Sequence, residues 1–168
     1  MSTAVIVNTY AYSATYVTDN ILRTLEDIVR DSGLDPLKIA DERLVLTRGI
    51  KAWIDSEHLE TIVLEVSNPS RTELIGRWDI HVAYGWNGDD GRFWVDSDQI
   101  KAAIRKAGVW PSTCEYRIIC TTKSGRPDVA GWNTTTLLST AGFVRQSLGT
   151  TISHSGLGAS ASYYRKVN

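Results

Sequence analysis

Asp79 and His81 are the residues of this chain whose types and spacing best suit acid–base chemistry. They lie two residues apart in a run of alternating apolar and polar residues, so both side chains are expected on the polar face of one strand. A carboxylate so close raises the pKa of an imidazole and can make it a general base. An ordinary solvated strand face gives the same spacing, and this simpler interpretation is favoured.

Other candidate catalytic groups are weaker. Four aspartates offer the carboxylate oxygens that hard cations bind, namely Asp89, Asp90, Asp96 and Asp98. A turn followed by a helix N-terminus explains them equally well, so we expect no metal. In residues 153–155 a histidine lies between two serines, but neighbouring strand residues point to opposite faces, which argues against a hydrolase. Phosphate-loop, dinucleotide and zinc patterns are absent, and we expect no cofactor.

Composition limits the partners. The chain has 168 residues and a formal charge of -1, which suits one domain without general attraction to nucleic acid or anionic lipid. It has neither a signal-peptide pattern nor an apolar run long enough to span a membrane, so a soluble, cytoplasmic protein is expected. Cys114 and Cys120 share one face of a predicted strand but stand too far apart to bridge, which predicts two reduced, partly buried thiols.

Hydrophobic periodicity predicts the elements that position these groups. Helices are expected over residues 13–32, from the Asp35 cap and Pro36 to about Asp55, and from Asp96 or Ser97 to Gly108. Residues 60–67 and 73–84 predict a hairpin with one wet face, and residues 114–122 a further strand. This order predicts an α+β fold with three helices packed on a mainly antiparallel sheet, whose core is residues 13–123.

The remaining residues, 124–168, are rich in Ser, Thr and Gly yet carry aromatic and branched apolar side chains. Because disordered tails lack such side chains, we expect this segment to fold onto the core. Residues 145–155 and 159–167 predict two strands, with breaks at Gly149, Gly156 and Gly158. A strand-forming tail beside an edge strand is a device for binding peptides, although a tail that simply completes the sheet is equally compatible.

Several phrases of the sequence resemble the bacterial HORMA domain family. They are TYVTDNIL at residues 15–22, GLDP at 33–36, RWDI at 77–80, YGW at 84–86, KSGRPDV at 123–129, GW at 131–132, SLG at 147–149 and HSGL at 154–157. The match spans nearly the whole chain. The resemblance implies one HORMA-like domain over residues 1–168, in which residues 124–168 form the safety belt.

The resemblance also implies a function. Such a domain is a signalling adaptor without catalytic activity that wraps its belt around a closure-motif peptide. In anti-phage operons of the CBASS type, the peptide-bound form activates a cyclic-oligonucleotide synthase of the CD-NTase type, and an AAA+ ATPase reopens the domain. The peptide is expected against residues 114–122 and under the belt, where the candidate binding residues are Cys114, Tyr116, Ile118, Cys120, Trp132, Phe143 and Leu148. Residues 1–12 resemble the segment that the ATPase pulls.

Two alternatives remain open at this point. One is a small enzyme that uses Asp79 and His81 for acid–base chemistry. The other is a constitutive structural subunit whose tail never moves. The sequence does not define the peptide, the product of the synthase or the surface that contacts it.

Overall fold

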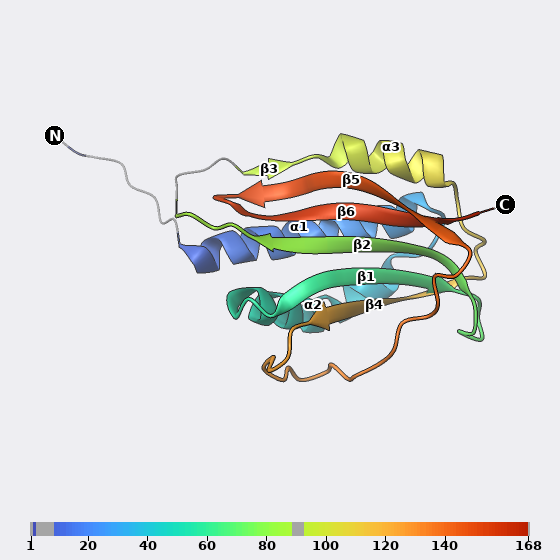
Figure 1. Cartoon of the computed structure of the whole chain (residues 1–168), viewed down its shortest axis with the longest axis horizontal. Coiled ribbons are helices and arrows are strands. Elements are labelled where there is room, and N and C mark those ends of the chain that lie inside the picture. Colours follow the sequence, from blue (N-terminus) through green and yellow to red (C-terminus); the bar gives the residue numbers. More distant parts are fainter. Residues whose placement is uncertain (1, 3–8, 89–92, 168) are drawn as a thin grey trace.

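The amphipathic and alternating segments form helices and strands in the computed structural model, which describes residue 2, residues 9–88 and residues 93–167. The described residues form three helices and six strands, and the predicted α+β class is confirmed (Figure 1). In chain order these are α1 (Tyr10–Asp31), α2 (Leu37–Asp55), β1 (Leu59–Ser67), β2 (Leu74–Tyr84), β3 (Trp94–Val95), α3 (Ser97–Ala107), β4 (Glu115–Thr122), β5 (Phe143–His154) and β6 (Leu157–Lys166).

The six strands form one sheet in the order β3-β5-β6-β2-β1-β4, and every neighbouring pair is antiparallel. In Figure 1, α1 and α2 lie behind this sheet, with α1 across its middle, and α3 lies above β5 at the top of the view. The apolar stripe of α1, which includes Val17, Ile21 and Leu25, is fully buried in the core. Burying it removes several large side chains from water, each contributing about 1.5–3 kcal/mol. No helix in the described part of the chain has the length and apolar character to cross a lipid bilayer.

The helix starts differ slightly from those predicted. α1 begins at Tyr10, three residues before the predicted start, because the side chain of Thr9 accepts a hydrogen bond from the backbone N–H of Tyr12. The N-cap position of α2 is Pro36 and not Asp35, although the Asp35 carboxylate still accepts the N–H of Leu37. Asp96 caps α3 as predicted and accepts the N–H of Gln99.

The β1–β2 hairpin is confirmed, but its predicted wet face is wrong at two positions. Trp78 faces the core, and Asp79 on the opposite face is only 8% exposed. Glu65 of β1 is 1% exposed on that same face. Residues from the C-terminal part of the chain cover Glu65, so alternation along the strand identified the two faces without revealing what covers the outer one.

The tail supplies two strands that are part of the central sheet. β6 pairs with β2 over residues 157–164, and Ile152 and Leu157 are fully buried. Ser155 and Gly156 make the turn between β5 and β6, and both have positive φ, which suits a tight hairpin. Gly149, predicted as a break, lies instead inside β5, where a shift in register makes a bulge.

One strand was not predicted. β3 has two exposed residues, Trp94 and Val95, that pair with the outer side of β5. So short a strand has no period to detect. β3 forms one edge of the sheet, and β4 forms the other.

Candidate functional site

β4 presents the open edge of the sheet. Its neighbour on one side is β1, and no other described strand pairs with its far side. Lys38 of α2 donates a hydrogen bond of 3.0 Å to the carbonyl of Tyr116, which shows that this carbonyl points outward. Backbone groups alternate along a strand, so the N–H and C=O groups of Ile118 and Cys120 point to the same open edge. The pairing of the other strands gives the same result. The N–H of Gly85 donates to the carbonyl of Gly156, and the registers of β2 with β6, β1 with β2 and β1 with β4 then direct the backbone groups of Ile118 and Cys120 to the open edge.

Residues 123–142, here called the crossing segment, connect β4 to β5 at the other side of the sheet. In Figure 1 this segment runs along the open edge of β4 before it rises to β5. It contains no regular helix or strand. The predicted belt of residues 124–168 therefore has two parts: an irregular segment outside the sheet, and a hairpin within it.

Trp132 attaches the crossing segment to α2. Its indole N–H donates a 3.0 Å hydrogen bond to the carbonyl of Val45, and its ring packs edge-on against Trp53 with a centroid separation of 5.0 Å. Gly49 makes room for this ring, because a Cβ atom at that position would lie 2.3 Å from the indole nitrogen of Trp132. Trp132 therefore occupies a notch in α2 that exists only because residue 49 has no side chain.

A second contact with α2 lies a few residues earlier in the crossing segment. The indole N–H of Trp53 donates to the carbonyl of Pro127 at 2.7 Å, and the guanidinium of Arg126 lies over the Trp53 ring at 5.1 Å. Such cation–π contacts stabilise by about 0.5–2 kcal/mol, depending on their exposure to water. Trp53 thus fixes the beginning of the segment and packs against the indole of Trp132.

The far end of the crossing segment is tied to the other face of the sheet. The buried carboxylate of Glu65 accepts a 2.6 Å hydrogen bond from Arg117 with one oxygen, and the backbone N–H of Leu138 at 2.8 Å with the other. Arg117 also donates to the Thr135 hydroxyl at 2.9 Å and to the Thr136 carbonyl at 2.7 Å. The segment is therefore fastened on both faces and passes around the edge of β4 between the two attachments.

A groove remains between β4 and the crossing segment, with a volume of about 190 Å³. We call it the edge groove. Its walls come from α2, β4 and the crossing segment: Trp53, Ile118, Ile119, Cys120, Thr122, Arg126, Trp132, Asn133, Thr134 and Thr135. It follows the outward backbone groups of β4, and it suits an extended chain that adds to the sheet as a further strand.

The two cysteines are both free thiols, as predicted. Burial raises the pKa of the Cys120 thiol, an effect that nearby Arg126 opposes, and burial also raises the pKa of Cys114. Because the thiolate is the nucleophilic form, both groups are poor nucleophiles near neutral pH. Their side chains serve instead as apolar surface beside the core.

The candidate binding residues do not all gather at one place. Ile118, Cys120 and Trp132 line the edge groove. Cys114 and Tyr116 line a neighbouring hollow at the start of β4, where the Tyr116 hydroxyl donates to the carbonyl of Asp35 at 2.7 Å. These five residues thus follow the same edge strand and the segment that covers it.

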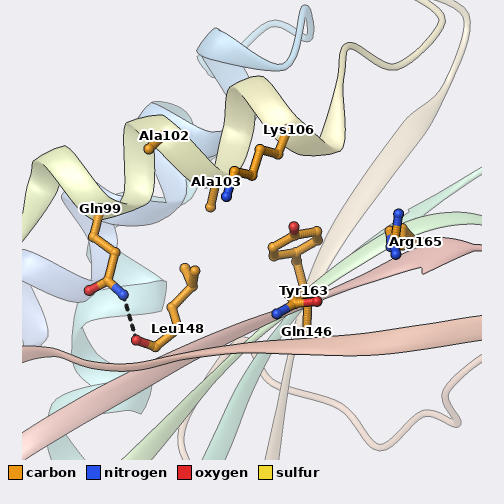
Figure 2. A pocket seen from close by; sticks show the side chains of 8 residues that line it. All are labelled: Gln99, Ala102, Ala103, Lys106, Gln146, Leu148, Tyr163 and Arg165. Carbon is orange, nitrogen blue, oxygen red and sulfur yellow. Dashed lines mark hydrogen bonds between the residues drawn. The ribbon is translucent and has the colours of Figure 1, made fainter.

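Phe143 and Leu148 lie elsewhere. Both belong to β5, which β6, β2 and β1 separate from β4. Leu148 lines a hollow of about 520 Å³ between α3 and the β5–β6 hairpin, where its carbonyl accepts a hydrogen bond from Gln99 (Figure 2). Phe143 and Leu148 are near Trp132 in the sequence but not in space, because the crossing segment leads from β4 across the sheet to β5.

Asp79 and His81 are separately engaged. The Arg77 guanidinium donates two hydrogen bonds to the Asp79 carboxylate, at 2.7 and 3.0 Å, and this ion pair is largely buried. The Nδ1 atom of His81 lies 3.3 Å from the hydroxyl of Thr61. This arrangement gives Asp79 a structural partner in place of the imidazole. Of the four aspartates considered for a metal, Asp96 and Asp98 belong to the start of α3, and Asp89 and Asp90 lie outside the described residues. The described residues include no group of three potential metal ligands.

A serine and histidine pair that the sequence did not suggest occurs at the start of α1. The hydroxyl of Ser13 lies 2.8 Å from Nδ1 of His154, and the indole of Trp86 donates to the same hydroxyl at 3.1 Å. Ser13 is fully buried and His154 is 3% exposed, with the Phe93 ring stacked on the imidazole at 4.1 Å. A substrate could not reach this hydroxyl, so the pair fastens α1 to the turn between β5 and β6.

The comparisons agree with this architecture. The family model for bacterial HORMA domain 2 matches residues 2–167, and the chain therefore belongs to the bacterial HORMA domain family. Proteins with this domain are in general non-catalytic, peptide-binding adaptors. No curated protein matches the chain.

Solved structures share the fold at low sequence identity. HTP-2 bound to HTP-3 motif-6 has a TM-score of 0.71 and 15% identity, covering 96% of this chain and 93% of that one. The E. coli MS115-1 CdnC:HORMA-deltaN complex has a TM-score of 0.63 and 10% identity, covering 99% and 94%. The E. coli MS115-1 HORMA:CdnC:Trip13 complex has a TM-score of 0.57 and 10% identity, covering 100% and 98%.

The notch in α2 predicts that replacing Gly49 with alanine lowers the stability of the protein, which is the opposite of the usual effect in a helix. Alanine in a helix interior is ordinarily more stable than glycine by about 1 kcal/mol. At position 49 the added Cβ atom meets Trp132, and such overpacking costs about 1–3 kcal/mol. We therefore expect Gly49→Ala to lower the free energy of unfolding in urea. In the Trp132→Ala background the same substitution should raise it, and a stabilising effect in the unmodified chain would contradict the notch.

The hydrogen bonds of Glu65 predict that a substitution at this position loosens the crossing segment locally. Glu65→Gln removes the charge that Arg117 and the Leu138 amide share, and such charge-assisted hydrogen bonds contribute about 1.5–3 kcal/mol each. Hydrogen exchange at the Leu138 amide should become faster. The matched control is Glu115→Gln, which breaks the exposed pair with Arg71 and should leave this amide unchanged. Unaltered exchange in Glu65→Gln would show that the tie does not hold the segment.

Proposed function

We propose that this protein is a non-catalytic signalling adaptor that binds an extended peptide in the edge groove. The observation that carries the proposal is the open edge of β4, whose Ile118 and Cys120 backbone groups face a groove closed on its outer side by the crossing segment. Strand addition would satisfy those backbone groups, and the crossing segment would hold the peptide against the sheet. Structures with the same fold, HTP-2 bound to HTP-3 motif-6 and C. elegans HTP-2 bound to a HIM-3 closure motif, support this proposal.

Peptide exchange requires the crossing segment to move. Its attachments at Trp132 and Glu65 lie on opposite faces of the sheet, so a peptide between them is enclosed on its outer side. Residues 123–142 carry the motion, while β5 and β6 remain paired in the sheet. We therefore assign the belt to the crossing segment and place the C-terminal hairpin with the core. An enclosed ligand dissociates slowly, and an AAA+ ATPase of the remodelling type would supply the opening step. A related HORMA domain forms a complex with Trip13, which supports this partner.

The partner that receives the signal is a cyclic-oligonucleotide synthase of the CD-NTase type. A domain with this fold forms a complex with CdnC, and that relationship supports the proposal. In this scheme the peptide-bound form binds and activates the synthase, and the peptide reports a foreign protein during anti-phage defence. We place the protein in the cytoplasm because both cysteines are free thiols, which is usual in reducing compartments.

The synthase assay tests this function. Peptides would be selected on the purified protein from a displayed library of random ten-residue sequences, then added to the protein together with a CD-NTase-type synthase that binds it. Product formation should rise only when a selected peptide is present. Trp132→Ala should release the peptide at least tenfold faster, because it removes one attachment of the crossing segment.

Trp94→Ala is the matched control, because Trp94 is an exposed tryptophan at the opposite edge of the sheet. It should leave peptide release unchanged. Equal product without peptide would refute signal-gated activation. Failure to select any peptide, with the protein folded, would refute the binding function itself.

The N-terminal segment supplies a second test. Deleting residues 1–8 leaves the Thr9 cap and the contact of Tyr10 with Trp86 in place, so α1 and peptide binding should be preserved. If the ATPase grips this segment, the deletion should abolish ATP-dependent peptide release. A longer deletion to Tyr12 would remove folded residues of α1 and is not informative. Normal ATP-dependent release from the shortened protein would rule out this point of engagement.

A further inference from the structure

The edge groove has a defined charge at one end. None of its lining residues is acidic, and its one charged lining residue is Arg126, near the C-terminal end of β4 beside Cys120 and Thr122. Lys123 lies at the same end, with its ammonium 5.5 Å from the centre of the Tyr84 ring. Two cations therefore stand where the strand ends and the crossing segment begins.

The Arg126 guanidinium is held in place but not neutralised. Its plane is positioned by the Trp53 ring, and its side chain is 25% exposed. Its ion-pair partner is Asp128, at 3.3 Å, whose own side chain is fully exposed. Exposed pairs of this kind contribute little, because water competes for both partners. In the described chain only this one hydrogen bond uses the five donors of the guanidinium.

A peptide strand in the groove would bring a side chain to this position. The outward backbone groups of Ile118 and Cys120 set the path of the strand, and alternate side chains of an added strand point toward α2. The side chain opposite Cys120 and Thr122 on that face would meet Trp53 and Arg126. There a carboxylate could accept two parallel hydrogen bonds, which the planar guanidinium is built to donate.

We propose that the bound peptide carries an Asp or Glu side chain that pairs with Arg126 at the C-terminal end of β4. This proposal rests on the peptide-binding function given above and defines one position of its ligand. Arg126 then acts as a specificity-determining residue, and Asp128 acts as a weak internal competitor for the same guanidinium.

The experiment compares charge at each peptide position. A library-selected peptide would be synthesised with Glu, Gln or Lys in turn at every position, and its affinity measured by calorimetry or fluorescence anisotropy. At one position the Glu peptide should bind about fivefold tighter than the Gln peptide, the size expected for a partly exposed ion pair. The Lys peptide should bind more weakly than either, and the differences should shrink in high salt.

Substitutions in the protein identify the partner. Arg126→Gln should remove the preference for Glu, and Arg126→Glu should reverse it in favour of Lys at the same position. Asp128→Asn should strengthen the Glu preference, because it frees the guanidinium. Arg105→Gln, an exposed arginine on α3, should change nothing.

The outcomes separate the two proposals. Peptides that bind with no charge preference at any position, or with a preference that Arg126→Glu leaves unchanged, would overturn the role of Arg126 and leave the peptide-binding function intact. Absence of binding for every peptide would instead refute the proposed function. A Glu preference that reverses in Arg126→Glu supports both.

Discussion

The fit of Trp132 against Gly49 is the interaction on which the arrangement of the candidate site depends. Between its ends, where Lys123 donates to the carbonyl of His58 and Gly142 accepts from Val167, the crossing segment has no strand pairing, so its position follows from a few side-chain contacts. Trp132 brings one end against α2 with a hydrogen bond and close packing, and only a glycine at position 49 permits this depth. Without that contact the edge groove would lose the indole of Trp132 from its wall opposite β4.

The proposed movement of the crossing segment would leave the fold intact. β6 is paired with β2 and largely buried, and β5, whose last residues are buried, is paired with β6, so the hairpin is joined to the central sheet. The crossing segment is held by Trp132, the Trp53 contacts and Glu65, and it contains Gly125 near its start and Gly142 at its end. Both glycines have positive φ, a backbone conformation that glycine adopts without strain, and nothing lies close to where a side chain would be. Opening the segment would break a few contacts while the six-stranded sheet remains intact.

Sequence periodicity predicted the helices, the β1–β2 hairpin and β4, because each has a long run of regularly spaced apolar residues. Their alternation also placed Ile118 and Cys120 on one face of β4. Periodicity does not show which strands become neighbours. The resemblance groups Phe143 and Leu148 with Trp132 under one belt, but both residues belong to β5, across the sheet from β4. The short β3 had no pattern to detect.

The residues that contact the candidate site could not be predicted from the sequence for a related reason. Trp132 was a candidate, but Gly49 is 83 residues away in the chain, and its only sequence signal is an isolated glycine within a helix. Glu65 lies on the face of the β1–β2 hairpin that alternation predicts to be solvated, and local spacing does not connect it with Arg117. Their role comes from the crossing segment that covers them, which long-range contacts place there and local spacing does not.

Backbone hydrogen exchange of the full chain, with and without a library-selected peptide, tests the central claim most directly. If the peptide adds to the open edge of β4, the amides of Ile118 and Cys120 should become strongly protected. Those of Arg117 and Ile119, which already pair with β1, should change little. This two-residue alternation along β4 is the predicted result. Protection confined to β3, or to the hollow between α3 and the β5–β6 hairpin, with β4 unchanged, would contradict the account.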